Sequence, residues 1–211
     1  MPDFNIMLLL HGEEKLELHK PFPPECEVIT NVKVADVADK GKAALITMEN
    51  TRSDKKTGDK LSTSTSKLFI RGIGGFGYKG NETQALPDIP EQLAKVTVSD
   101  KTSANQAIIY RLCSDLNPLH INPDMAALGG FDRPILHGLC SFGYAARVIL
   151  KEICNHDVNK FKDISARFTG HVFPGETLVT SIWKDGNSII FAMKTEEREQ
   201  KVVCMGSATI A

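Results

Sequence analysis

The chain has 211 residues, with 25 basic and 26 acidic side chains and a formal net charge of −1. This balance gives no electrostatic footprint for nucleic acid or for an anionic membrane surface, so neither is expected as a partner. No apolar run reaches the roughly 20 residues that span a bilayer, and the apolar segment 7–10 is too short for a secretory signal, so the start reads as mature sequence. The composition suffices for one large globular domain or two packed halves.

The five cysteines are scattered and include no C-x-x-C pair. Their number and spacing predict free thiols in a reducing compartment rather than a disulfide framework. A cysteine nucleophile would need a paired base, and Cys113 has His120 within reach in sequence. A small packed side chain is nevertheless the better interpretation of both Cys113 and Cys140.

The first third of the chain is rich in segments typical of β-strands. The expected strands are 5–10, 15–19, 26–35, 43–49 and 66–72. The polar run 51–64 is expected to be a long hairpin loop or a ragged edge.

A glycine-dense segment, 72–80, follows these strands. Its first six residues satisfy G-x-G-x-x-G, but no amphipathic helix comes after them, so a dinucleotide site is not expected. The glycines indicate a tight corner where the backbone passes close to another element. The segment 80–92, with two prolines and many polar residues, predicts a linker between two halves.

The second half predicts helices first and strands afterwards. Asn122 before a proline predicts the cap of a short helix through Ala127, which Gly129 and Gly130 end. The mostly apolar segment 137–153 predicts a longer, buried helix. Four strands are expected after it, at 164–172, 176–184, 188–195 and 202–210, with a hairpin turn at 185–187. This order predicts an α+β fold in which an antiparallel sheet wraps around the long helix.

The most informative motif is Asp115-Leu-Asn117-Pro-Leu-His120. A carboxylate and an imidazole held together can divide the handling of a proton, because their ordinary pKa values bracket mild acid–base work. On a regular helix Asp115 and His120 would lie roughly 140° apart, so they converge only if the segment is irregular. The alternative is an Asx turn that caps a helix, with His120 a polar surface residue.

Gly138 begins the long predicted helix, where the first backbone N–H groups lack intrahelical partners. Those groups could stabilise a developing negative charge, and a glycine lets a substrate approach the backbone closely. The alternative is a glycine chosen for packing. His120, His137 and His171 show no familiar ligand spacing, so no metal is expected, and His137 is interpreted as a helix-start residue beside the pocket.

Residues 101–210 resemble the MaoC-like or hydratase 2 family of (R)-specific 2-enoyl-CoA hydratases. The resemblance rests on the motif above and on the segments 131–140, 166–168 and 173–177, and it is strongest to the hydratase unit of the eukaryotic peroxisomal multifunctional enzyme of β-oxidation. The segments 11–14 and 72–77 extend it into the first half. It implies a hot-dog fold, with a catalytic MaoC-like domain at 92–211 and an incomplete hot-dog-like half at 1–85, a remnant of a double hot-dog that lacks its early strands and helix.

The resemblance implies hydration of trans-2-enoyl-CoA to (3R)-3-hydroxyacyl-CoA, with acyl-CoA as the partner and without a metal or a redox cofactor. Asp115 and His120 would hold the water and move protons, Asn117 would orient the water or Asp115, and the Gly138 N–H would polarise the thioester. The positions implied to contact the substrate are His11, Gly12, Lys40 and Phe168.

Each substrate-contacting position also has an ordinary interpretation. Lys40 could meet a phosphate as a point charge or be a solvated turn lysine, and His11 could be a strand-end residue. Phe168, within a predicted strand, could simply belong to the core.

Ser114 stands where the family usually has glycine, and a positive φ there would cost about 1–2 kcal/mol. An incomplete first half would leave an apolar sheet face exposed, which predicts a homodimer, instability or a changed substrate range. Alternatives to the hydratase are a hot-dog thioesterase, an acyl-carrier-protein dehydratase and a non-catalytic acyl-CoA-binding protein. The resemblance implies the peroxisome, but residues 208–211 are not an S-K-L type address, so import would need a partner or the protein would stay cytosolic.

Overall fold

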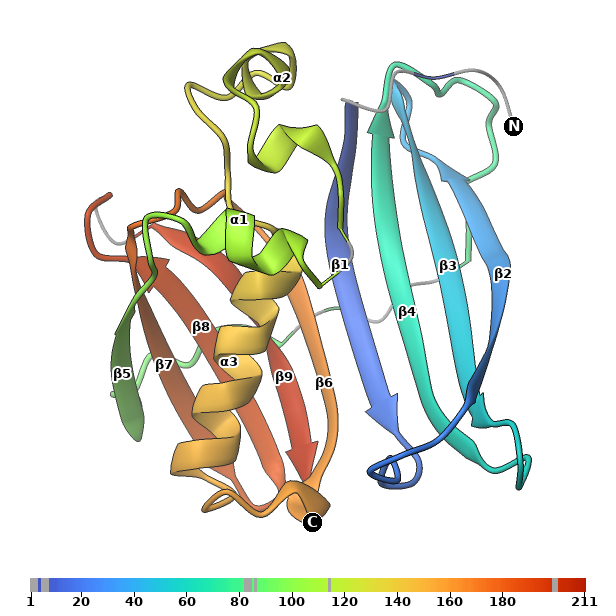
Figure 1. Ribbon diagram of the computed structural model, residues 1–211. Helices are drawn as coiled ribbons and strands as arrows, with labels where there is room; N and C mark the ends of the chain where they lie inside the picture. The colour runs from blue at the N-terminus through green and yellow to red at the C-terminus, as the bar shows by residue number, and fades with distance from the viewer. Residues whose placement is uncertain (1–3, 5–7, 82–84, 86, 114, 199–200) are drawn as a thin grey trace.

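The computed structural model describes residues 4, 8–81, 85, 87–113, 115–198 and 201–211. Nine strands form one antiparallel sheet in the order β2-β3-β4-β1-β6-β9-β8-β7-β5. They are β1 (Leu9–Leu18), β2 (Val28–Asp39), β3 (Ala43–Asp54), β4 (Lys60–Arg71), β5 (Val96–Lys101), β6 (Phe161–Phe168), β7 (Thr177–Asp185), β8 (Ser188–Thr195) and β9 (Val202–Ile210). Figure 1 shows that β1–β4 make one half of the sheet and β5–β9 the other.

The helix α3 (Gly138–Glu152) lies across one face of the β5–β9 half (Figure 1). Its apolar side chains enter the main core together with the inward-facing residues of the strands. The members that are completely buried include Ala145, Ile149, Ile164, Leu178, Ile182 and Phe191. The predicted sheet around a buried helix is confirmed.

The β1–β4 half has no helix of its own among the described residues (Figure 1). The strand register places Val32, Asn50, Ser64 and Leu16 side by side on the face that α3 covers in the other half. On this face the middle strands carry hydrogen-bonded polar side chains, since Asn50 and Arg52 both donate to Ser64. Within the strands β1–β4, the large apolar side chains that are exposed lie on the edge strand β2 and include its valines at 28, 32, 34 and 37.

Pairing between β1 and β6 joins the two halves into a continuous sheet. Glu13–Glu17 lie opposite Asp163–Arg167. On the outer face, Arg167 and Lys67 both form ion pairs with Glu13, and these hydrogen bonds hold the pKa of Glu13 below its ordinary value although burial opposes them. A division of the chain at 85–92 remains a prediction, because the sheet itself has no break there.

Several strand predictions need correction. The run 51–64 is not a loop, since β3 extends to Asp54 and β4 starts at Lys60 with a tight turn between them. The Ser and Thr side chains of this run lie on a polar face of the sheet, and such strands show no hydrophobic alternation from which they could be predicted. The predicted strands 5–10 and 15–19 are one strand, β1, with a bulge between His11 and Glu13, and residues 5–7 lie outside the described residues.

In the second half, the strand predicted at 164–172 runs over Phe161–Phe168, while the strands 188–195 and 202–210 are confirmed. The strand β5 and the short helix α1 (Gln106–Arg111) were not predicted, because both are short and carry weak apolar patterns. The helix α2 (Pro123–Leu128) is confirmed, and the Asn122 side chain accepts hydrogen bonds from the N–H groups of Asp124 and Met125.

The glycine-dense corner is confirmed. The Asp39 carboxylate accepts hydrogen bonds from the N–H groups of Gly41, Gly75 and Gly77, and these bonds lower its pKa. A Cβ at Gly74 would lie 2.4 Å from the carbonyl oxygen of Gly41. Backbone therefore passes against backbone at this point, as the glycine spacing indicated.

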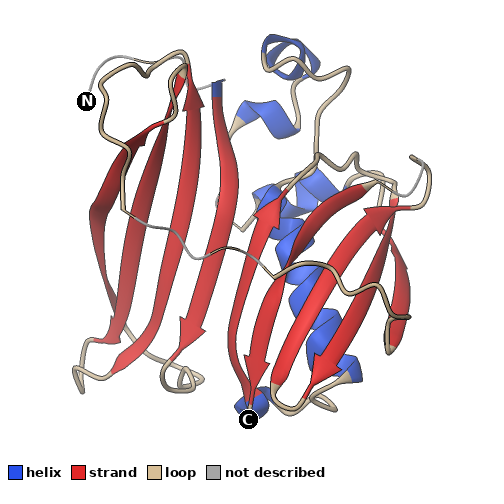
Figure 2. Ribbon diagram, turned by 180° about the vertical axis from the view of Figure 1, so that it is seen from behind, coloured by secondary structure: helices blue, strands red, loops and turns tan. Residues whose placement is uncertain are grey.

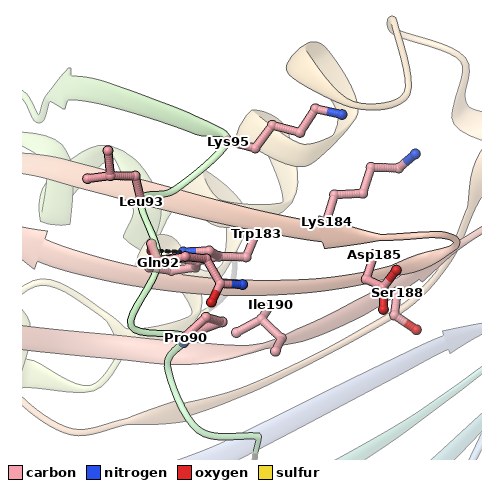
Figure 3. Close-up of a pocket in the computed structure, with 9 residues that line it drawn as sticks. All are labelled: Pro90, Gln92, Leu93, Lys95, Trp183, Lys184, Asp185, Ser188 and Ile190. Carbon is pink, nitrogen blue, oxygen red and sulfur yellow. Dashed lines mark hydrogen bonds between the residues drawn. The ribbon is translucent and has the colours of Figure 1, made fainter.

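The segment that leads into β5 runs along the face of the sheet opposite α3 (Figure 2). The segment is fixed to the sheet by Trp183, whose Nε1–H donates to the carbonyl of Gln92 over 2.8 Å (Figure 3). Among the described residues, no helix has the length and hydropathy needed to cross a membrane.

Candidate active site

A cavity of about 710 Å³ opens between the two halves of the sheet. One wall comes from the start of β1 and the end of β4, and the other from the segments around residues 115–120 and 131–141 and the end of β6. The cavity contains all four predicted catalytic positions: Asp115, Asn117, His120 and Gly138.

The segment from Asp115 to His120 is irregular, as the convergence of its two ends requires. The Asp115 carboxylate accepts a hydrogen bond from the Asn117 N–H over 3.0 Å, which makes an Asx turn. The Asn117 side chain accepts from the Leu119 N–H and caps the single 3₁₀ turn η2 (Pro118–His120). This turn is the one expected by the alternative interpretation, but a surface position for His120 is wrong, because its side chain is only 9% exposed.

His120 is held in one orientation by the backbone. Its Nδ1 lies 2.8 Å from the carbonyl oxygen of Ile135, and since a carbonyl only accepts, Nδ1 carries the proton. The neutral ring therefore has its lone pair on Nε2. Burial lowers the pKa of His120 below its ordinary value, so this neutral form persists into mildly acidic solution.

The contact between Asn117 and Asp115 differs from the predicted one, whereas orientation of the water by Asn117 remains a prediction. Its backbone N–H, not its side chain, contacts Asp115, and its side-chain oxygen is used by the cap. The side-chain NH₂ group remains a donor on the cavity wall. Ser114, the expected departure from the family pattern, lies outside the described residues.

Gly138 is the first residue of α3 and lines the cavity. His137 precedes it as N-cap but makes no side-chain cap, so the positive end of a 15-residue helix faces the cavity without a protein cap. A Cβ at position 138 would lie 3.2–3.3 Å from three ring atoms of Phe168. The packing reason for a glycine therefore applies here, and the chemical reason remains a prediction.

Of the four predicted substrate-contacting residues, His11 and Phe168 line the cavity. Their rings meet edge to face at 5.3 Å between centroids, and His11 Nε2 lies 3.0 Å from the Glu14 carboxylate. Gly12 sits in the β1 bulge close to the carbonyl of Lys67, and Lys40 is exposed in the turn between β2 and β3. Neither lies on the cavity wall, so their contact with a substrate remains a prediction.

All five cysteines are free thiols, as predicted. Cys140 is buried in the core, and burial raises its pKa to about 11, which disfavours the nucleophilic thiolate. The interpretation of Cys113 as a packed side chain is wrong, because it is exposed.

His137 is the feature of the site that sequence reasoning underestimated. Its ring stacks on that of His120 with 3.7 Å between centroids, and Tyr110 covers it at 4.7 Å. Asp115, His120 and His137 each offer an atom within 4.8 Å of the other two. The position of His137 beside a helix start was predicted, but its stacking depends on the fold of the 115–120 turn.

Beside the cavity, a partly buried ion pair supports the segment that carries His171. The Glu176 carboxylate accepts from Arg198 Nε at 2.5 Å and Nη2 at 3.0 Å, and Arg198 also contacts the ring and carbonyl of His171. Burial and the Arg198 charge lower the pKa of His171, which lines the cavity as a neutral ring.

A second hollow, of about 410 Å³, lies on the opposite face of the sheet around Trp183. Lys95 and Lys184 point away from the Trp183 ring (Figure 3), and no histidine lines it. Four histidines, at 11, 120, 137 and 171, line the first cavity together with Asp115, so the first cavity is the candidate active site.

A sheet wrapped around one helix, with an acid–base pair opposite the helix start, defines a hot-dog enzyme of the MaoC type. The MaoC like domain family matches residues 85–204, and the MFE-2 hydratase 2 N-terminal domain family matches residues 1–72. The chain belongs to the MaoC-like family, and the predicted hot-dog fold is confirmed.

Three known proteins illustrate the likeness. The chain is 43% identical over 211 residues to "Probable enoyl-CoA hydratase 2" of Dictyostelium discoideum, covering 99% of this chain and 72% of that protein. It is 42% identical to "Peroxisomal multifunctional enzyme type 2" of Mus musculus, over 95% of this chain but 27% of that protein. A crystal structure titled as a MaoC-like dehydratase from Phytophthora capsici superposes with a TM-score of 0.90 at 36% identity, over all of this chain and 73% of the other.

Proposed function

We propose that the protein hydrates a trans-2-enoyl-CoA to a (3R)-3-hydroxyacyl-CoA in fatty-acid β-oxidation. The observation that carries the proposal is the convergence of Asp115 and His120 opposite the uncapped start of α3 in one cavity. The names of the relatives, enoyl-CoA hydratase 2 among them, agree with this chemistry.

In the proposed reaction, water lies between Asp115 and His120. One of them takes a proton from the water as its oxygen bonds to C3, and a proton from the pair is delivered to C2, so that the sum is addition of H and OH across the double bond. His120 suits the base role, because its Nε2 lone pair is free and its pKa is lowered by burial.

The thioester oxygen gains negative charge during this addition. The N–H of Gly138, at the positive end of α3, would stabilise that charge, and removal of one such donor typically costs about 10²–10³ in rate. Asn117 fixes the direction of the Asp115 carboxylate through its backbone N–H.

We expect the reaction to need no metal and no redox cofactor. Supporting this, His137 Nε2 and Asp115 Oδ2 are 3.9 Å apart, whereas two ligands of tetrahedral zinc at about 2.0–2.1 Å lie about 3.4 Å apart. Activity should therefore survive exhaustive chelation.

The test is the loss of enoyl thioester absorbance with a medium-chain trans-2-enoyl-CoA, with the chirality of the product determined. Asp115→Asn and His120→Ala should each abolish turnover. Matched controls are Asp124→Asn, on exposed α2, and His19→Ala, whose ring contacts Thr63 outside the cavity; both should keep full activity. A folded protein that hydrates no enoyl-CoA would refute the proposal.

The same assay set separates the other candidate activities. A dehydratase would favour carrier-bound 3-hydroxyacyl substrates, and the superposed Phytophthora capsici protein is named a MaoC-like dehydratase. A thioesterase would release a free thiol. Acyl-CoA binding without turnover would indicate a non-catalytic protein.

We propose that two copies associate through the exposed valines of the edge strand β2, because an unpaired apolar edge favours pairing with another chain. Sedimentation of the wild type and of Val32→Lys would test this, and an unchanged mass would refute it. A peroxisomal location is proposed from the name of the mouse relative, and imaging of the tagged protein in cells would test it.

A further inference from the structure

His137 is buried with both of its ring nitrogens unused. The residue is 1% exposed, and within the described chain neither Nδ1 nor Nε2 has a hydrogen-bond partner. Leaving a buried polar group unsatisfied costs about 1–3 kcal/mol, so such a group calls for an explanation. A purely apolar side chain would pack between His120 and Tyr110 without that cost.

One of these two nitrogens lies close to Asp115 of the proposed catalytic pair. His137 Nε2 lies 3.9 Å from Asp115 Oδ2, too far for a direct hydrogen bond but near enough for both to contact one intervening atom. One atom each from Asp115, His120 and His137 lies within 4.8 Å of the others. Three points so spaced always have a common position within about 2.8 Å of each, which is the length of a hydrogen bond to water.

The same spacing does not fit a zinc ion. At zinc–ligand distances of about 2.0–2.1 Å, tetrahedral ligands lie about 3.4 Å from one another, and the 3.9 Å separation would force the ligand angle far open. A water molecule accepts the observed spacing without any movement of the side chains.

We propose that His137 is a third holder of the attacking water, donating a hydrogen bond from Nε2–H to one of the two lone pairs on the water oxygen. This inference rests on the hydratase proposed above. The two water hydrogens then point to Asp115 and to Nε2 of His120, and the remaining lone pair is directed at C3. All four hydrogen-bonding positions of the water are assigned, and attack through the free lone pair keeps the proton count of the reaction unchanged.

The charge state of His137 agrees with this role. Burial, and then the neighbouring His120, lower the pKa of His137 to about 4 although Asp115 opposes them, so the ring is neutral in the physiological range and carries a single N–H. A neutral donor positions the water without the positive charge that would weaken its oxygen as a nucleophile. It also leaves the Asp115 carboxylate free to act as an acceptor for the water.

Three substitutions test the inference by separating the ring from its nitrogen. His137→Phe keeps the stacked ring and removes both nitrogens. His137→Gln places an amide nitrogen near the position of Nε2, and His137→Asn places one near the position of Nδ1. For each variant, kcat and KM for hydration of a trans-2-enoyl-CoA and the thermal midpoint would be measured.

We expect His137→Phe to lose about 10- to 100-fold in kcat, with KM within about twofold, while its thermal midpoint is equal to or above that of the wild type. His137→Gln should recover most of kcat, whereas His137→Asn should not. If His137 had only a structural role, His137→Phe should keep the wild-type kcat, because a phenylalanine fills the same space.

Wild-type kcat in a folded His137→Phe would overturn the inference and leave the hydratase intact. If His137→Phe fails to fold, equal kcat values for the Gln and Asn variants would overturn it instead. Absence of hydration by the wild-type protein would overturn the proposed function and this inference together, so the two failures are distinguishable.

Discussion

Substitution of Glu176 should destabilise the protein more than loss of any exposed ion pair. The Glu176 side chain is buried at 5% exposure and serves three donors: two N–H groups of Arg198 and the backbone N–H of Phe173 at 2.7 Å. Glu176→Ala removes all three acceptor contacts at once. It leaves a buried amide without a partner and an arginine charge that is only partly solvated.

The expected magnitude follows from these contacts. An unsatisfied buried amide costs about 1–3 kcal/mol, and loss of a charge-assisted pair adds about 1.5–3 kcal/mol. Arg198 is 31% exposed, so water compensates part of the second amount. The sum is about 3–4 kcal/mol of unfolding free energy, or roughly a 10 °C fall in the thermal midpoint for a chain of this size.

Urea unfolding followed by circular dichroism measures this directly, with the m-value checked for constancy. Glu176→Gln retains an acceptor for the Phe173 amide and should cost about half as much. The matched control is Glu17→Ala, which removes an exposed pair with Lys15 and should change stability by less than about 0.5 kcal/mol. Equal stabilities of Glu176→Ala and Glu17→Ala would refute the reasoning.

Three further predictions concern packing and pH. Gly143→Ala, in open space within α3, should raise the free energy of unfolding by about 0.5–1 kcal/mol. Gly74→Ala, whose Cβ would meet backbone at 2.4 Å, should lower it by about 1–3 kcal/mol. Thermal melts showing the reverse order would contradict this account of the two glycines. The midpoint of the decline of kcat/KM at acid pH should lie below pH 6.5, because burial lowers the pKa of His120 and its neutral form is the active one. A midpoint at pH 7 or above would exclude His120 as the base. Burial alone would raise the pKa of Glu197, but hydrogen bonds from Lys101 and Thr177 lower it to about 2. Ionised Glu197 should therefore add about 1 kcal/mol to the free energy of unfolding, after allowance for solvent screening, above pH 4.5, and this should be lost as the pH falls toward 2. The wild type should then be more stable than Glu197→Gln near neutral pH but not in acid, and an equal difference at both pH values would contradict this assignment.

The second half of the fold could be predicted from sequence because its signals are local. The apolar residues of α3 and the turn at 185–187 each determine their own structure, and Asn122 is a cap that depends only on its neighbours. The first half was predicted less well. Its polar strands, above all Lys60–Arg71, pair through Ser and Thr side chains on a face that no helix covers in the described structure, so hydrophobic alternation carries little information there.

The candidate site divides in the same way. Asp115 and His120 could be recognised as a possible acid–base pair from their types and spacing, because the turn that gathers them is coded within six residues. The choice of this pair over a simple Asx cap, and the role of Gly138, depended on the family resemblance. The stacking of His137 on His120 depends on how that turn meets the start of α3, which is a contact between segments and has no local signal.

The cavity itself depends on pairing over the longest range. Its acid–base groups come from the second half, but the opposite wall comes from β1 and β4, which reach the site only because β1 pairs with β6 across some 150 residues. The edge-to-face contact of His11 with Phe168 spans this junction and packs beside Gly138. The second half thus supplies the chemistry, while the first half supplies the wall against which a substrate would be aligned. A substitution on that wall, such as at Leu68, should therefore alter KM and chain-length preference before it alters kcat.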